Sequence, residues 1–177
     1  MSENHFDVAP LPGYPVEYGL LLSSLQSVTH EGRDELGEVD PDVICWQPCP
    51  NGHSIGGVLL HIAEVEAYWI EEFSLGRIIS PEEAKMCMSA QIDQHAGTWP
   101  TPHHEPLSFY YELLDRIRAR TLESLRQFEP PDTIKQSRWG TMTLRWVLAH
   151  VAEHEAYHMG QAVLLKHMST HLRRNDG

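Results

Sequence analysis

Three histidines recur at every fourth position in one apolar stretch of the sequence. His150, His154 and His158 lie within residues 143–166, which hold no proline and whose spacing predicts a helix. Four residues turn a helix by only about 40° beyond a full circle, so the three imidazoles follow one stripe. Apolar residues share or flank that stripe, which we therefore expect to face inward: Val147, Val151, Leu164 and Leu165. Two neutral imidazoles at this spacing can bind one divalent metal ion.

A fourth histidine lies on the inward face of another predicted helix. His61 belongs to residues 54–75 and alternates at helical spacing with Val58, Val65 and Tyr68. Helical bundles build metal sites from donors on facing helices. His61 and a pair of histidines from residues 143–166 would supply three neutral ligands and leave a coordination position open, which is typical of reactive sites. Zinc, nickel, iron and manganese all suit this ligand set, and periodicity does not choose between the pairs 150/154 and 154/158.

Residues 154–158 also spell H-E-x-x-H, the zinc motif of metallopeptidases. In that motif both histidines bind the ion and the glutamate, here Glu155, is the general base. The surrounding sequence does not fit, because a metzincin needs glycine and histidine where this chain has Gln161 and Leu164. No later glutamate follows to act as a third ligand. A peptidase is therefore disfavoured.

Four amphipathic stretches organise the chain around these histidines. They predict helices over residues 16–30, 54–75, 106–128 and 143–166, with two long crossover connections over 31–53 and 76–105. Pro81 can begin a short helix within the second connection. We find no segment of period-two alternation and therefore expect no β-sheet. The chain is predicted to be all-α, a four-helix bundle forming a single domain over residues 1–177.

Composition narrows the possible partners. The net charge of -12 repels phosphate, so nucleic acid is not an expected partner. No run of eighteen apolar residues is present, and the N-terminus resembles no leader, which predicts a cytoplasmic protein without membrane contact. Three cysteines, an odd number, favour reduced thiols over a disulfide framework.

Two segments resemble the DinB-like (YfiT-like) superfamily. They are HSIGGVLLHIAEVEAYWI, residues 53–70, and HVAEHEAYHMGQAVLLKH, residues 150–167. The resemblance implies a bundle of up-down-down-up arrangement, often a homodimer, that binds divalent zinc or nickel. It places the metal ligands on His61, His154 and His158, with Gly160-Gln161 matching the end of the motif. His150 then becomes a supporting or core residue.

The resemblance says less about the reaction than about the residues of the site. Some relatives transfer low-molecular-weight thiols or hydrolyse small substrates, which predicts a metal-dependent enzyme acting on a small molecule. A non-catalytic metal- or ligand-binding stress-response module is the alternative. Glu64 and Glu155 are candidates for proton transfer or for orienting an imidazole, although we favour solvated carboxylates for both. Trp46, Trp99 and Trp139 are predicted in loops that could cover a small-molecule pocket.

Overall fold

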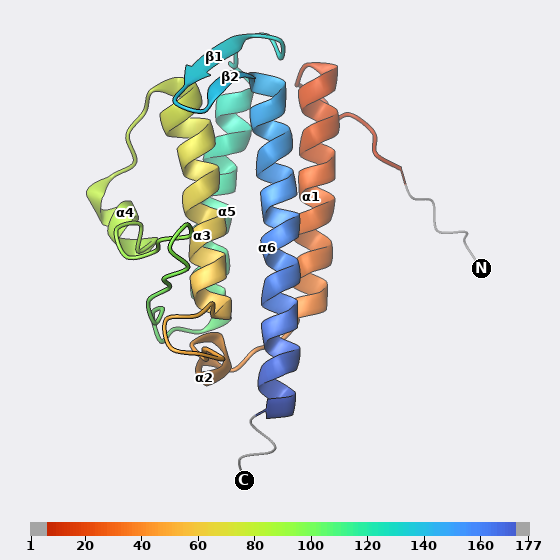
Figure 1. Ribbon diagram of the computed structural model, residues 1–177. Helices are drawn as coiled ribbons and strands as arrows, with labels where there is room; N and C mark the ends of the chain where they lie inside the picture. Colours follow the sequence, from red (N-terminus) through yellow and green to blue (C-terminus); the bar gives the residue numbers. More distant parts are fainter. Residues whose placement is uncertain (1–6, 173–177) are drawn as a thin grey trace, which may run out of the picture.

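Four long helices lie side by side in the computed structural model, which describes residues 7–172 (Figure 1). Residues 1–6, part of the segment used to exclude a leader, lie outside the described residues, as do residues 173–177. None of the described helices is long and apolar enough to cross a membrane. The elements, in chain order, are α1 (Val16–Leu36), α2 (Pro41–Ile44), α3 (Ile55–Ala67), the π-helical segment η1 (Tyr68–Ser74), α4 (Pro81–Met86), α5 (Leu107–Leu125), β1 (Ile134–Ser137), β2 (Gly140–Thr143) and α6 (Leu144–Leu172).

Helices α1 and α6 run in one direction, and α3 and α5 run in the other (Figure 1). Helix α6 packs against both α1 and α3, and α3 packs against α5. The approach of α1 to α6 is close at Gly32, where a Cβ atom would lie 2.8 Å from the side chain of Met159. A larger side chain at residue 32 would have to displace the side chain of Met159. These contacts place α3, which carries His61, face to face with α6, which carries His154 and His158.

Side-chain caps begin three of the helices near their predicted starts. The side chain of Ser54 accepts a hydrogen bond from the backbone N–H of Gly57 and so begins α3. Ser80 caps the short helix α4, which has Pro81 in its first turn. Thr143 accepts from the backbone N–H of Trp146 at the start of α6. The predicted starts of these three helices are therefore confirmed.

The prediction that the chain contains no sheet was wrong. Strands β1 and β2 form an antiparallel hairpin in which Ile134 pairs with Thr143 and Ser137 with Gly140. Each strand has only four residues, too few for a period-two pattern to stand out from the surrounding loop. Gly140, with φ of 125°, makes the tight turn possible. The hairpin covers one end of the four long helices (Figure 1).

Several predicted boundaries also need correction. Helix α1 continues to Leu36 and ends at Gly37, whose φ is 54°, because Gly32 lies inside the helix as a packing residue. The crossover over residues 31–53 therefore contains the end of α1 and all of α2. Helix α6 extends to Leu172, six residues beyond the prediction. Leu164 is 57% exposed and does not share the inward stripe, whereas Leu165 is buried.

A buried ion network joins all four long helices at mid-length. The guanidinium of Arg118 on α5 donates to both carboxylate oxygens of Glu66 on α3, at 2.8 and 3.0 Å. It also donates to Glu155 on α6 and to the hydroxyl of Thr29 on α1, which in turn donates to Glu155. Desolvation by burial would lower the pKa of Arg118. The carboxylates of Glu66 and Glu155 outweigh this effect and raise the pKa of Arg118 above its ordinary value.

The network divides the hydrophobic core into two apolar clusters. One cluster gathers the N-terminal parts of α1 and α6 with η1, and includes Leu22, Ile70 and Leu148. The other gathers the N-terminal parts of α3 and α5 with the C-terminal half of α6, and includes Leu59, Ile117 and Leu165. We call Thr29, Glu66, Arg118 and Glu155, which lie at the border of the two clusters, the polar layer.

Removing the cation of the polar layer should strongly destabilise the protein. In Arg118→Leu, the carboxylates of Glu66 and Glu155 remain buried without their partner, which predicts a loss of about 3–5 kcal/mol in the free energy of unfolding. Urea denaturation followed by circular dichroism measures this loss. The matched control is Arg145→Gln, which breaks a half-exposed ion pair to Glu17 and should cost less than about 1 kcal/mol. Equal losses in both variants would contradict the importance of the layer.

Candidate metal centre

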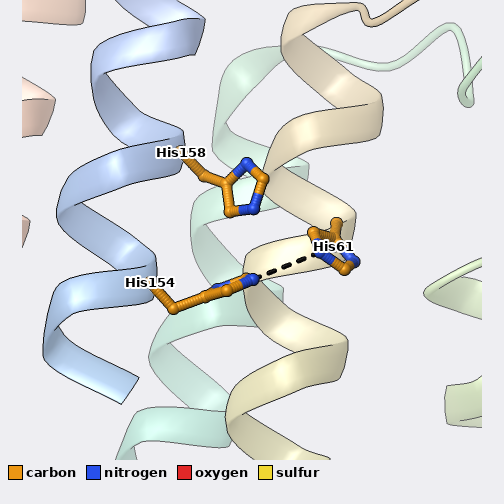
Figure 2. Close-up of side chains that lie close together, drawn as sticks. All are labelled: His61, His154 and His158. Atoms are coloured by element: carbon orange, nitrogen blue, oxygen red, sulfur yellow. Dashed lines mark hydrogen bonds between the residues drawn. The ribbon is translucent and has the colours of Figure 1, made fainter. Parts of the chain in front are cut away.

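Three imidazoles from two helices converge between α3 and α6. His61 projects from the middle of α3, and His154 and His158 project from successive turns of α6 (Figure 2). One ring nitrogen from each lies within 4.8 Å of the others. The Nε2 atoms of His61 and His154 are 3.2 Å apart. The structure thus brings together the three residues that the resemblance singled out.

The tautomer of His158 is set by a residue one turn later. Its Nδ1 lies 2.7 Å from the side-chain oxygen Oε1 of Gln161, which can only accept, so Nδ1 carries the proton. The lone pair is then on Nε2, which is buried and has no hydrogen-bond partner among the described residues. A histidine ligand is commonly held this way, with one nitrogen bonded to a neighbour and the other free for the metal. Gln161 was noticed in the sequence only as part of a motif, and its contact supplies the physical reason.

Two unpartnered ring nitrogens make the cluster suitable for a cation. Besides His158 Nε2, the Nδ1 atom of His61 is buried without a hydrogen bond among the described residues. His61 and His158 are 5% and 2% exposed, so water cannot readily replace the missing partners. Three neutral imidazoles are a fitting ligand set for a divalent transition metal. The residues present therefore fit such an ion.

Burial keeps the imidazoles of His154 and His158 neutral. Desolvation, followed by the neighbouring rings of His158 and His61, lowers the pKa of His154 to about 2. Desolvation also lowers the pKa of His158 to about 4, although the hydrogen bond that His158 donates to Gln161 opposes the shift. A neutral imidazole is the form that binds a metal ion, because the proton and the metal compete for one lone pair.

His150 takes no part in the cluster. Its ring stacks on Trp146, with centroids 4.9 Å apart and an angle of 6° between planes, and also contacts Trp69. This aromatic packing explains why the first histidine of the stripe is only half buried. Periodicity left the pairs 150/154 and 154/158 open, and the structure places the second pair beside His61.

Glu155 is not the solvated carboxylate that we favoured from the sequence. It is 3% exposed and is held by Arg118 and Thr29 in the polar layer. Burial raises its pKa despite the opposing effect of Arg118. Although it separates the two histidines in H-E-x-x-H, it is engaged across the bundle with α1 and α5. This arrangement removes the general base that a peptidase mechanism would require.

A cavity of about 530 Å³ adjoins the histidine cluster at His61. His61 and Glu64 from α3 form one part of its wall, and Tyr68, Ile79 and Trp139 form an apolar part. Of the loop tryptophans, Trp139 lines this cavity. Trp99 is buried with its ring centroid 5.3 Å from that of His61, and Trp46 packs at the edge of the core. A cavity that one of the three loop tryptophans helps to line is therefore present beside His61.

The neutral imidazoles predict acid sensitivity of the metal-free protein. In the unfolded chain, His154 and His158 bind protons below about pH 6.5. In the folded protein the pKa is about 2 for His154 and about 4 for His158. Because the unfolded state then binds more protons, the free energy of unfolding should fall below about pH 6.5, by about 1.4 kcal/mol per unit for each histidine. Urea denaturation between about pH 7 and 5 measures the slope.

The comparison variants are His158→Gln and His167→Gln. His158→Gln should reduce the slope of the free energy of unfolding against pH by the contribution of one histidine. The second changes an exposed histidine on the same helix and should leave the slope unchanged. A slope that is identical in the protein and in His158→Gln would show that His158 is not held neutral by the fold.

Comparison with known proteins now adds the family. No curated protein matches this chain. A family model described as mycothiol-S-transferase matches residues 20–169, a range that spans all four long helices and all three clustered histidines. The chain belongs to the mycothiol-S-transferase family and is a DinB-like protein.

Proposed function

We propose that this protein is a metal-dependent thiol S-transferase acting on small molecules. The observation that carries the proposal is the cluster of His61, His154 and His158, with unpartnered ring nitrogens beside a cavity of about 530 Å³. The family description supports thiol transfer over hydrolysis, and a low-molecular-weight thiol such as mycothiol is the proposed donor. A non-catalytic binding module is not favoured, because the family is described as a transferase.

The proposed metal is held by three neutral ligands, His61, His154 and His158. Zinc or nickel is the leading candidate, and iron and manganese are tolerated by the same donors. A divalent ion with an open coordination position lowers the pKa of a bound thiol, so that the thiolate forms near neutral pH. In the overall reaction the thiol gives up its proton, its sulfur bonds to an electrophilic carbon, and a leaving group departs from that carbon.

The residues of this chain would prepare the site before any reaction. Gln161 fixes the proton of His158 on Nδ1 and leaves Nε2 free for a metal ion shared with His61 and His154. Trp99 covers the ring of His61 and limits water beside it. The polar layer fixes the rotation of α6, because Glu155 lies between the two histidines in sequence and is tied to Arg118. The cavity then admits a small molecule without rearrangement of the helices.

The architecture proposed around this site is a DinB-like four-helix bundle. Helices α1, α3, α5 and α6 would form it in an up-down-down-up arrangement, with residues 31–53 and 76–105 as crossover connections. We further propose that residues 1–177 form one domain, that the protein is cytoplasmic, and that it assembles as a homodimer.

Metal content is the first test of this function. Protein purified without a tag should hold about one equivalent of transition metal per chain, measured by elemental analysis. His61→Ala and His158→Ala should each lose most of it, because two imidazoles chelate less tightly than three. His150→Ala is the control on the same stripe and should retain the ion. Full occupancy in His158→Ala would refute the proposed ligand set.

Chelation should lower the melting temperature. An ion that binds only the folded form at about 100 times its dissociation constant stabilises that form by about 2.7 kcal/mol. For a chain of this length, such a loss lowers the melting temperature by about 5–10 °C. Differential scanning calorimetry before and after treatment with a chelator measures the shift, and zinc or nickel should restore it. A His158→Ala sample should show little response to the chelator.

A further inference from the structure

The two ring nitrogens of His61 face different surroundings. Nε2 lies 3.2 Å from Nε2 of His154 and is turned toward the histidine cluster (Figure 2). Nδ1, on the other edge of the ring, is buried and has no hydrogen-bond partner among the described residues. When Nε2 binds a metal ion, the proton of the neutral imidazole must be on Nδ1. A buried N–H donor without an acceptor is costly, so His61 needs an acceptor at Nδ1.

The carboxylate of Glu64 lies next to this nitrogen. Glu64 follows His61 by one turn of α3, and its Oε2 is 3.7 Å from Nδ1. This distance exceeds that of a hydrogen bond by about 0.5 Å, which rotation of the Glu64 side chain can remove. The side chain is 24% exposed and lines the cavity of about 530 Å³, so it has room to rotate. The nearest available acceptor for Nδ1 is therefore an anionic one.

The charge of Glu64 is not taken up by an arginine of the described residues. Glu66, two residues later on α3, is bound by Arg118 in the polar layer. The guanidinium of Arg138, in the same cavity wall as Glu64, lies over the neighbouring tryptophan ring at 4.3 Å and makes no ion pair with Glu64. Glu72, also in this wall, accepts a hydrogen bond from a backbone N–H and is not paired with His61. Glu64 is thus the carboxylate of the wall that can serve the imidazole.

We propose that Glu64 positions His61 for the metal ion by accepting a hydrogen bond from its Nδ1–H. This inference rests on the proposed function and adds a positioning residue to its site, because Glu64 acts through His61. Gln161 has the same role toward His158, whose Nδ1 is 2.7 Å from Oε1 of the amide. The two acceptors differ in charge, since the amide is neutral and the carboxylate is anionic. The carboxylate therefore also makes the imidazole of His61 a more basic ligand.

Other roles for Glu64 lead to different results. If Glu64 only adds negative charge to the interior, then a second carboxylate of the same wall should affect metal binding equally. If Glu64 instead binds an occupant of the cavity or pairs with Arg138, then its loss should leave the metal affinity unchanged. Only contact with His61 makes both the metal affinity and the environment of Nδ1–H depend on Glu64.

The first measurement is the affinity of the full-length protein for cobalt(II), obtained by competition with a chelator at neutral pH. Glu64→Gln should raise the dissociation constant by about tenfold or more, as expected when the partner of a metal-binding histidine is lost. Glu72→Gln is the matched control, because it removes a carboxylate from the same cavity wall, and it should leave the constant nearly unchanged. Circular dichroism verifies that each variant is folded.

The second measurement is a spectroscopic signature of the ring N–H groups. In the cobalt-loaded protein, the N–H protons of bound histidines give strongly shifted proton NMR signals that disappear in D₂O. Glu64→Gln should move one of these signals and speed its exchange with water, because the hydrogen bond at Nδ1 of His61 is weakened. Gln161→Leu should move a different signal, that of His158. Glu72→Gln should move neither signal.

Three outcomes would overturn this inference. These are unchanged cobalt affinity in Glu64→Gln, an equal loss of affinity in Glu72→Gln, or a shift in Glu64→Gln of the same signal that Gln161→Leu moves. In each case the unaltered protein still binds cobalt, so the proposed metal site stands. Failure of the unaltered protein to bind cobalt would instead contradict the proposed function itself.

Discussion

The guanidinium of Arg118 is the constraint on which the arrangement of the four long helices depends. It is bonded to Thr29, Glu66 and Glu155, one from each of the other three helices. A buried charge of this kind tolerates only a geometry in which all of its donors are satisfied. Apolar contacts alone would allow a helix to slide or rotate at low cost, whereas these bonds fix the depth and rotation of each helix.

The same constraint positions the histidines. Glu155 must point toward Arg118, and neighbouring residues on a helix differ in direction by about 100°. His154 and His158 flank Glu155 and therefore face α3, where His61 lies five residues before Glu66. The ion network and the three imidazoles thus lie at adjacent levels of the same helices. The ion pairs of Arg118 thus hold the helices in place, and the helices in turn position the three neutral histidines.

Much of this arrangement could be predicted from the sequence, and what was missed has physical causes. Spacing within one helix predicted the inward position of His154 and His158, because it depends only on helical geometry. Helical spacing also predicted the inward position of His61, but rejecting His150 required the resemblance, since contacts between helices leave no local periodicity. Glu155 was misjudged because its partner Arg118 lies 37 residues earlier in the chain. The hairpin was missed because strands of four residues carry too short a pattern.

The net charge of the polar layer helps to explain how three uncharged imidazoles could hold a divalent cation. Arg118 carries one positive charge, whereas Glu66 and Glu155 together carry two negative charges when ionised, so the layer is net negative. Glu64, which pairs with no arginine of the described residues, adds to this negative charge on the cavity side. In a poorly screened interior, such nearby negative charge stabilises a cation held by uncharged imidazoles. Direct carboxylate ligation would lower the charge on the ion and weaken its effect on a bound thiol. Carboxylates that lie near the ion without binding it can thus favour its binding. They leave the ion's charge free to lower the pKa of a bound thiol.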